Sequence, residues 1–147
     1  MSQKKPNVWA RKKARRALVQ ATYQWQVSGN AFSTIRDDFA ESDALKKADH
    51  EFFEGMLAAV IHSTAELDAH YSDLLDRPQA QLDQVEQAIL RLATHEFKAH
   101  IEVPYRVVID EYVELAKTFG AQDSYKYVNG ILDKLAVRLR AVETGHG

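Results

Sequence analysis

The first 36 residues hold eight cations and no acid. Five of these cations fall in one short segment, at Arg11, Lys12, Lys13, Arg15 and Arg16. The remaining 111 residues hold eleven cations and 21 acids, a local balance of −10. A basic end on an acidic body is typical of proteins that bind a polyanion. The chemistry that this segment could perform is therefore contact with phosphate groups.

The same segment has a helical period, so its cations can be placed around a helix. The stripe predicted to face the core is Ala14, Leu18, Ala21 and Trp25, spaced i, i+4, i+7 and i+11. At about 100° per residue, the residues opposite this stripe are Lys12, Arg16 and Tyr23, while Arg11, Lys13 and Arg15 lie on its flanks. An aromatic ring that points outward in line with cations suits a surface that binds single-stranded RNA. The cations would follow the RNA backbone and a base would stack on the ring. The alternative is a solvated charged face with Tyr23 as a partly covered surface residue.

The other reactive residues form no catalytic or metal-binding pattern. The chain has no cysteine, and its six glycines form neither of the common phosphate-binding glycine motifs. The histidines His62, His70, His95 and His100 lack usual ligand spacing, and the only Glu-x-x-His pair is Glu143 with His146. We therefore predict that the protein is not an enzyme and needs no metal or cofactor.

Every long segment has the period of an amphipathic helix, which predicts an all-α fold. The expected helices span 7–29, 32–39, 49–76, 83–97, 104–120 and 123–139. Asn7 is a plausible N-cap of the first, and Pro78 stops the third. The longest apolar run is Met56–Ile61, far shorter than the roughly 18 residues of a membrane span. We expect a cytoplasmic protein that does not enter a membrane.

Local signals indicate where these helices begin and end. Asp83 and Glu86 are spaced as a capping box, and Gly120 is a good C-cap. Gly130 lies inside the last helical stripe, and we expect another backbone to come close to it. The segment Arg77–Gln81 is the best boundary between two halves. It divides the chain into an N-terminal bundle, 1–78, with the basic first helix, and a C-terminal bundle, 79–147.

Three segments, in this order along the chain, resemble the NusB family of transcription antitermination factors. Residues 11–25, RKKARRALVQATYQW, resemble the arginine-rich opening of the family, and residues 82–93, LDQVEQAILRLA, resemble its fourth helix. The match is most specific at 103–134, which begins VPYRVVIDEYVELAKTFG and continues through DSYKYVNGILDK. Asp110 stands where Asn is common and Tyr127 where Phe is usual.

The resemblance implies two helical bundles packed into one compact domain. It also implies a pairing with the ribosomal small-subunit protein that doubles as NusE. The pair binds the single-stranded boxA element of nascent RNA and helps to build a processive RNA polymerase antitermination complex, notably on ribosomal RNA operons. Matching positions for RNA binding are Arg11, Lys12, Lys13, Arg15, Arg16, Tyr23, Lys126 and Tyr127. Glu86 and Asp123 match positions that contact RNA or the partner, and both are also well placed as helix-start carboxylates.

Two other classes of function are compatible with parts of the sequence. Some RNA methyltransferases carry a NusB-like domain at the N-terminus, but that function needs a downstream cofactor domain and this chain ends at residue 147. A stand-alone protein-interaction module needs no RNA contact. It leaves the acid-free opening unexplained, although that segment could face an acidic protein.

Overall fold

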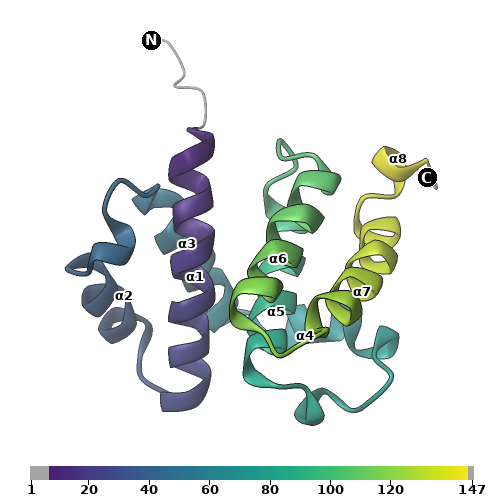
Figure 1. The fold of residues 1–147 in the computed structure, drawn as a ribbon, viewed down its shortest axis with the longest axis horizontal. Helices are drawn as coiled ribbons and strands as arrows, with labels where there is room; N and C mark the ends of the chain where they lie inside the picture. Colours follow the sequence, from purple (N-terminus) through teal and green to yellow (C-terminus); the bar gives the residue numbers. More distant parts are fainter. Residues whose placement is uncertain (1–6, 146–147) are drawn as a thin grey trace.

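The computed structural model describes residues 7–145, and within that range its regular structure is entirely helical, as the sequence predicts (Figure 1). The α-helices are α1 (Val8–Ser28), α2 (Phe32–Ala40), α3 (His50–His62), α4 (Thr64–Tyr71), α5 (Gln84–Ala99), α6 (Tyr105–Phe119), α7 (Ser124–Leu139) and α8 (Ala141–Thr144). Short 3-10 turns are η1 (Asp43–Leu45), η2 (Ser72–Leu74) and η3 (Gln79–Gln81). Lys4 and Lys5, two of the eight cations in the first 36 residues, and His146 of the Glu-x-x-His pair lie outside the described residues.

Helix α1 begins and ends where the sequence predicts. The Asn7 side chain accepts a hydrogen bond from the backbone N–H of Ala10 at 3.1 Å, which satisfies one free donor of the first turn. At the other end Gly29 takes a left-handed conformation with φ of 72° and donates its N–H to the carbonyl of Trp25. Leu18 is fully buried, whereas Trp25 is only half-buried and packs against the edge of the core.

The single helix predicted for 49–76 is wrong, because the structure divides it into α3, α4 and η2. Asp49 caps α3 as an N-cap should, accepting from the N–H of Phe52 at 3.0 Å. The break falls at Ser63, whose φ and ψ of −122° and 26° are not helical. The Thr64 hydroxyl donates to the carbonyls of Val60 and Ile61. A hydroxyl that bonds to the preceding turn bends a helix, which apolar periodicity does not reveal.

Helix α5 has the predicted capping box. The Asp83 carboxylate accepts from the N–H of Glu86 at 2.7 Å, and Glu86 accepts from the N–H of Asp83 at 3.4 Å. Gly120 ends α6 as predicted, although with φ of −85° rather than left-handed. A Cβ at Gly120 would lie 2.6 Å from the carbonyl oxygen of Ala116, so close backbone approach is what requires glycine there.

The prediction for Gly130 is wrong. A Cβ added there meets nothing within 4 Å, so no other backbone comes close to this position. Gly130 lies on the exposed side of α7, opposite the buried Val128, Ile131 and Leu132.

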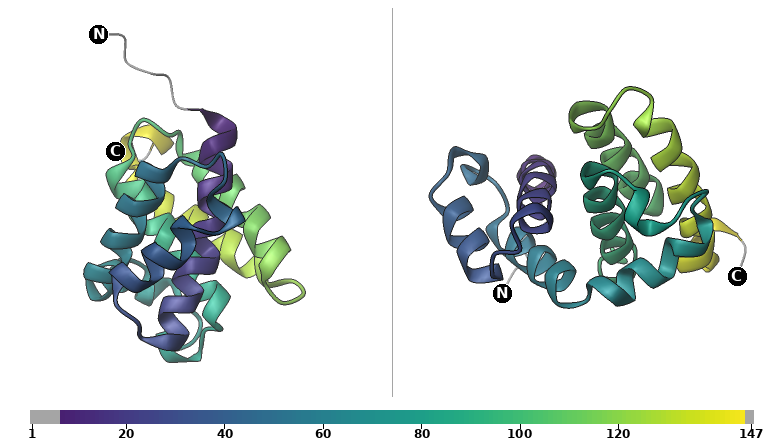
Figure 2. Two further views of the ribbon diagram at one scale, coloured as in Figure 1. Left: turned by 90° about the vertical axis from the view of Figure 1, so that its left-hand side faces the viewer. Right: turned by 90° about the horizontal axis from the view of Figure 1, so that it is seen from below.

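Helix α5 is central to the packing. It contacts α1, α3 and α4 on one side and α6 and α7 on the other. Seen from below, α1 and α2 form one group, α5, α6 and α7 form another, and α3 and α4 run between them (Figure 2). The largest fully buried side chains include Phe53, Tyr71, Phe97 and Tyr112. We propose the division at residues 78 and 79 as the boundary between two bundles that pack into one domain along α5.

Candidate nucleic-acid interface

One face of α1 carries exposed cations. Lys12, Lys13 and Arg16, here called the basic strip, are all exposed. The helical wheel predicts this for Lys12 and Arg16, whereas it places Lys13 on a flank. The opposite face is buried, with Ala14, Leu18 and Ala21 inside the core. The apolar stripe of α1 therefore fixes the direction in which the basic strip points.

The three cations of the basic strip differ in how strongly the protein already engages them. Lys12 pairs with Glu111 of α6 at 2.6 Å. Lys13 donates a long hydrogen bond, 3.4 Å, to the carbonyl of Lys46. The Arg16 guanidinium lies 5.3 Å from the centroid of the Phe119 ring and has no ion pair with any residue of the described range. Lys13 and Arg16 are thus the cations most available to an incoming anion.

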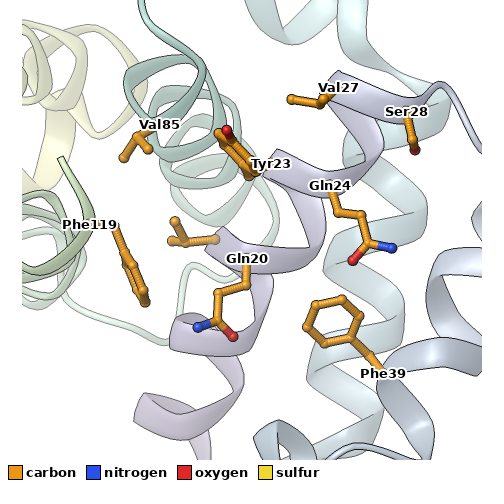
Figure 3. Close-up of a pocket in the computed structure, with 9 residues that line it drawn as sticks. Gln20, Tyr23, Gln24, Val27, Ser28, Phe39, Val85 and Phe119 are labelled. Atoms are coloured by element: carbon orange, nitrogen blue, oxygen red, sulfur yellow. The ribbon is translucent and has the colours of Figure 1, made fainter.

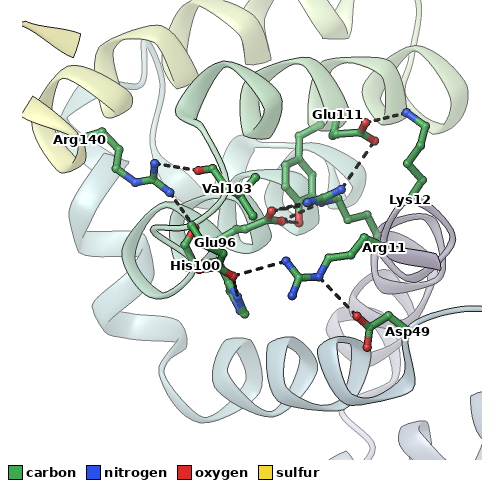
Figure 4. A network of polar contacts seen from close by, with 11 residues as sticks. Arg11, Lys12, Asp49, Glu96, His100, Val103, Glu111 and Arg140 are labelled. Atoms are coloured by element: carbon green, nitrogen blue, oxygen red, sulfur yellow. Dashed lines mark hydrogen bonds and ion pairs between the residues drawn. The ribbon is translucent and has the colours of Figure 1, made fainter. Parts of the chain in front are cut away.

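Arg11 lies between surface and interior. Its side chain is only 16% exposed and lies 3.5 Å from both Asp49 and Glu102. Its guanidinium also lies 4.4 Å from the centroid of the Phe52 ring. Figure 4 shows Arg11 beneath Lys12, with a dashed line from its guanidinium to Asp49. An anion could reach Arg11 only by competing with two carboxylates.

Arg15, which the helical wheel places on a flank of α1 and the resemblance places among the RNA-binding positions, is buried rather than exposed. The residue is 3% exposed, and its guanidinium donates to both carboxylate oxygens of Glu96 in α5, the shortest contact being 2.7 Å. The Tyr112 hydroxyl of α6 donates to the same carboxylate at 2.8 Å. Arg15 therefore joins α1 to α5 and, through Glu96, to α6, and is not available to a ligand in this structure.

Burial and the charge of Glu96 shift the pKa values of Arg15 and Tyr112. Although desolvation lowers the pKa of Arg15, the hydrogen bonds and charge of Glu96 outweigh it and hold that pKa above its ordinary value. Burial, together with the charge of Glu96, raises the pKa of the Tyr112 hydroxyl well above its ordinary value. Arg15 thus remains charged and Tyr112 neutral throughout the physiological range.

Below the basic strip, α1 forms the floor of a largely apolar groove of about 680 Å³. Its lining residues, here called the α1 groove, are Val19, Gln20, Tyr23, Gln24, Val27, Ser28, Phe39, Val85 and Phe119. Figure 3 shows Phe39 on one side of α1, with Val85 and Phe119 on the other. Tyr23 is 43% exposed, so its ring is both accessible and part of the groove wall. The sequence predicts the outward direction of Tyr23 but not the walls, which come from distant segments.

A second predicted patch surrounds the start of α7. Lys126 is exposed and pairs with Asp123 at 3.3 Å. Tyr127 is half-buried, its hydroxyl accepts from the N–H of Asp76 at 3.2 Å, and the Arg77 guanidinium lies 4.5 Å from its ring centroid. Lys126 is therefore open to a ligand, whereas Tyr127 offers only part of its ring.

Glu86 and Asp123, the two carboxylates for which both a binding and a helix-start role are predicted, differ in burial and in capping contacts. Glu86 is buried in its capping box and also accepts from the Ser124 hydroxyl at 2.8 Å, so it links α5 to α7. Asp123 is exposed and occupies the N-cap position of α7 with φ of 67°, but its side chain caps no backbone N–H. The predicted helix-start position is confirmed for both residues, but only Glu86 makes a capping hydrogen bond.

No group of three or more His, Asp or Glu side chains between residues 7 and 145 is arranged to hold a metal ion. Across the same range, none of the helices combines the length and apolar character needed to cross a membrane.

Comparisons with known proteins agree on one family. The NusB family profile matches residues 12–137. The chain is 52% identical to the transcription antitermination protein NusB of Alcanivorax borkumensis over 134 residues, covering 91% of this chain and 89% of that protein. It is 48% identical to the protein of the same name from Paraburkholderia phymatum, covering 92% and 93%. The solved structure of T. maritima NusB superposes with a TM-score of 0.77 at 29% identity, covering 91% and 92% of the two chains.

Proposed function

The chain belongs to the NusB family, and we propose that it binds boxA-type single-stranded RNA together with the ribosomal small-subunit protein that acts as NusE. Its curated relatives are named transcription antitermination proteins, which supports an antitermination role without enzymatic activity. In the proposal, the RNA and the ribosomal protein bring this chain into the RNA polymerase antitermination complex and promote transcription of ribosomal RNA operons.

The observation that supports RNA binding most strongly is the basic strip. Lys12, Lys13 and Arg16 project from one face of a rigid helix, and the first 36 residues contain no acid that would repel a phosphate. Such contacts supply most of the sequence-independent affinity for a nucleic acid. We propose that Lys12, Lys13 and Arg16 follow the RNA backbone, that Lys126 adds a further phosphate contact, and that Tyr23 and Tyr127 offer ring surface to bases.

Arg11, Arg15, Glu86 and Asp123 take other places in this proposal. Arg11 is a secondary contact that first has to leave Asp49 and Glu102. Arg15 supports the interface from beneath, because it fixes α1 against α5. The exposed Asp123 is proposed as a hydrogen-bond acceptor for RNA or the ribosomal protein, while Glu86 acts by holding the start of α5 against α7.

The α1 groove is the surface that we assign to the ribosomal protein. Apolar side chains dominate its lining, and phosphates gain little from such a surface. The basic strip and the α1 groove adjoin along α1, so RNA and protein would be held next to each other. Arg16 lies where the two surfaces meet, because its guanidinium is 5.3 Å from the ring centroid of Phe119 in the α1 groove.

A titration tests the proposed function directly. A boxA-like RNA and a scrambled RNA of equal length and composition are titrated against the protein, with and without the ribosomal protein. We expect a preference for the boxA-like RNA that reaches about tenfold or more, about 1.4 kcal/mol, when the ribosomal protein is present. Equal affinity for both RNAs, with and without the ribosomal protein, would reject the proposal. A protein that binds the ribosomal protein but neither RNA would be a pure protein-interaction module.

Tyr23→Ala separates a role in binding from a role in the core. Because Tyr23 projects from the exposed face, we expect the free energy of unfolding to change by no more than about 0.5 kcal/mol. RNA affinity should fall by about 1–3 kcal/mol if a base stacks on the ring.

Leu18→Ala is the matched control on the buried face of the same helix. Leu18 is 0% exposed, and its truncation should cost about 2–5 kcal/mol of stability. If denaturant unfolding shows Tyr23→Ala to be as destabilising as Leu18→Ala, the assignment of helix faces fails. If Tyr23→Ala is stable and binds RNA normally, only the stacking role fails.

A further inference from the structure

Trp9 is the most conspicuous exposed side chain near the basic strip. It lies in the first turn of α1 and is 74% exposed. It is absent from the hydrophobic core and from the partly buried residues packed against that core. Its ring also makes no aromatic or cation–π contact with another residue of the 7–145 range. Packing within residues 7–145 therefore does not explain why a tryptophan stands at this position.

The position of Trp9 on the helix is not random relative to the cations. Lys12 and Lys13 follow it by three and four residues, so they are its neighbours on the helix surface. Arg16 is about two turns further along, and Tyr23 about two turns beyond Arg16, within about 40° of the direction of Trp9. At about 1.5 Å of rise per residue, the two rings lie about 21 Å apart along the axis. The exposed face of α1 therefore has an aromatic residue at each end and cations between them.

We propose that Trp9 is a base-stacking platform for bound single-stranded RNA, placed at the N-terminal end of the basic strip. The inference rests on the proposed function, because it assumes that the basic strip follows an RNA backbone. Stacking on a large flat ring tolerates any base, and indole offers a large π surface. Lys12 and Lys13 are close enough to Trp9 to hold the phosphates next to the stacked base.

The positive charge on the exposed face of α1 favours single-stranded RNA over other binding partners. A second copy of the chain would bring a second set of the same cations to the contact if the two copies used the same face, and like charges disfavour such a pairing. An apolar protein partner would cover Trp9 but would leave Lys13 and Arg16 without anions. Single-stranded RNA supplies both the flat apolar bases and the negative charge that this face lacks.

Tryptophan fluorescence reports on Trp9 directly, because the chain has only two tryptophans, Trp9 and Trp25. The Trp25→Phe variant leaves Trp9 as the sole indole. Titration of this variant with boxA-like RNA should quench its emission and reduce its quenching by acrylamide, a neutral quencher that RNA charge does not repel. Emission and acrylamide access that stay unchanged while the RNA binds would overturn the proposal.

Substitutions at Trp9 separate stacking from charge. Trp9→Ala should weaken RNA binding about 5- to 150-fold without changing the salt dependence of the affinity, since no phosphate contact is removed. Trp9→Phe should recover part of the loss, and Trp9→Leu less, because a leucine has no ring to stack. Ile101→Ala is the control, since Ile101 is 75% exposed but lies outside α1, and it should bind RNA as the unmodified protein does.

The outcomes distinguish this inference from the proposed function. Unmodified protein that fails to prefer boxA-like RNA contradicts the proposed function itself. Unmodified protein that prefers it, combined with a Trp9→Ala variant of equal affinity, overturns only the stacking role. A Trp9→Ala variant that binds RNA normally but loses the ribosomal protein, or changes its oligomeric state by sedimentation, shows that Trp9 is a protein contact and also overturns the proposal.

Discussion

Arg15→Ala is expected to lower the free energy of unfolding by about 3–5 kcal/mol, measured by denaturant titration at neutral pH. The substitution leaves the Glu96 carboxylate in the interior without its cation, with the Tyr112 hydroxyl as its remaining partner. A buried charge that loses its partner retains the penalty of its desolvation, which is why the expected loss exceeds that of a surface ion pair.

Arg16→Ala is the control for this prediction. It removes the same side chain one residue further along α1, but from the exposed face, and should change stability by only a few tenths of a kcal/mol. Glu96→Gln should lower the free energy of unfolding by less than Arg15→Ala and by more than Arg16→Ala. Its amide keeps the size of the carboxylate and can still accept hydrogen bonds. Equal unfolding midpoints for Arg15→Ala and Arg16→Ala would contradict the structural role of Arg15.

This contrast shows what a single sequence could predict about the interface. The stripe of Ala14, Leu18 and Ala21 fixes the faces of α1, so the exposed positions of Lys12, Arg16 and Tyr23 follow from helical geometry alone. The burial of Arg15 does not follow from helical geometry, because a residue on the flank of a helix can face either solvent or a neighbouring helix. Only the packing of α5 and α6 against that flank decides it.

A signal for the buried pair was nevertheless present in α5. Glu96 lies directly before Phe97 and three residues after Ala93, at the edge of the apolar stripe of that helix. A carboxylate in such a position needs a cation or several donors if the stripe is buried. Nothing local identifies that cation, since Arg15 lies 81 residues away. Long-range pairing of this kind requires the three-dimensional fold.

The fold itself was more predictable than the site. Apolar periodicity predicts α1, α2, α5, α6 and α7, and end signals agree with it for α1, α5 and α6. The break at Ser63 was missed and the role of Gly130 was predicted wrongly, both for local reasons. The Thr64 hydroxyl bonds to the carbonyl of Val60 beside the break between α3 and α4. Gly130 lies on an exposed helix surface, where no neighbouring atom requires a residue without a side chain. Both errors concern backbone details that hydrophobic patterning does not encode.

The central claim is that the basic strip contacts RNA phosphates, and the salt dependence of RNA affinity tests it most directly. Each phosphate that a protein neutralises on a single strand contributes about 0.7 to the slope of log affinity against log salt. Replacing Lys12, Lys13 and Arg16 together with Ala should therefore reduce that slope by about 2. The melting temperature should change little, because among residues 7–145 the variant removes only one ion pair, between the exposed Lys12 and the partly exposed Glu111.

A second triple variant controls for net charge. Lys98, Arg106 and Lys134 are exposed cations on α5, α6 and α7, and their replacement with Ala removes the same charge from other surfaces. The measurement is the slope for boxA-like RNA across a salt series with unmodified protein and both variants. We predict a slope reduced by about 2 for the variant of the basic strip and a nearly unchanged slope for the control. Equal slopes for the unmodified protein and the basic-strip variant would contradict the claim and move the RNA site away from α1.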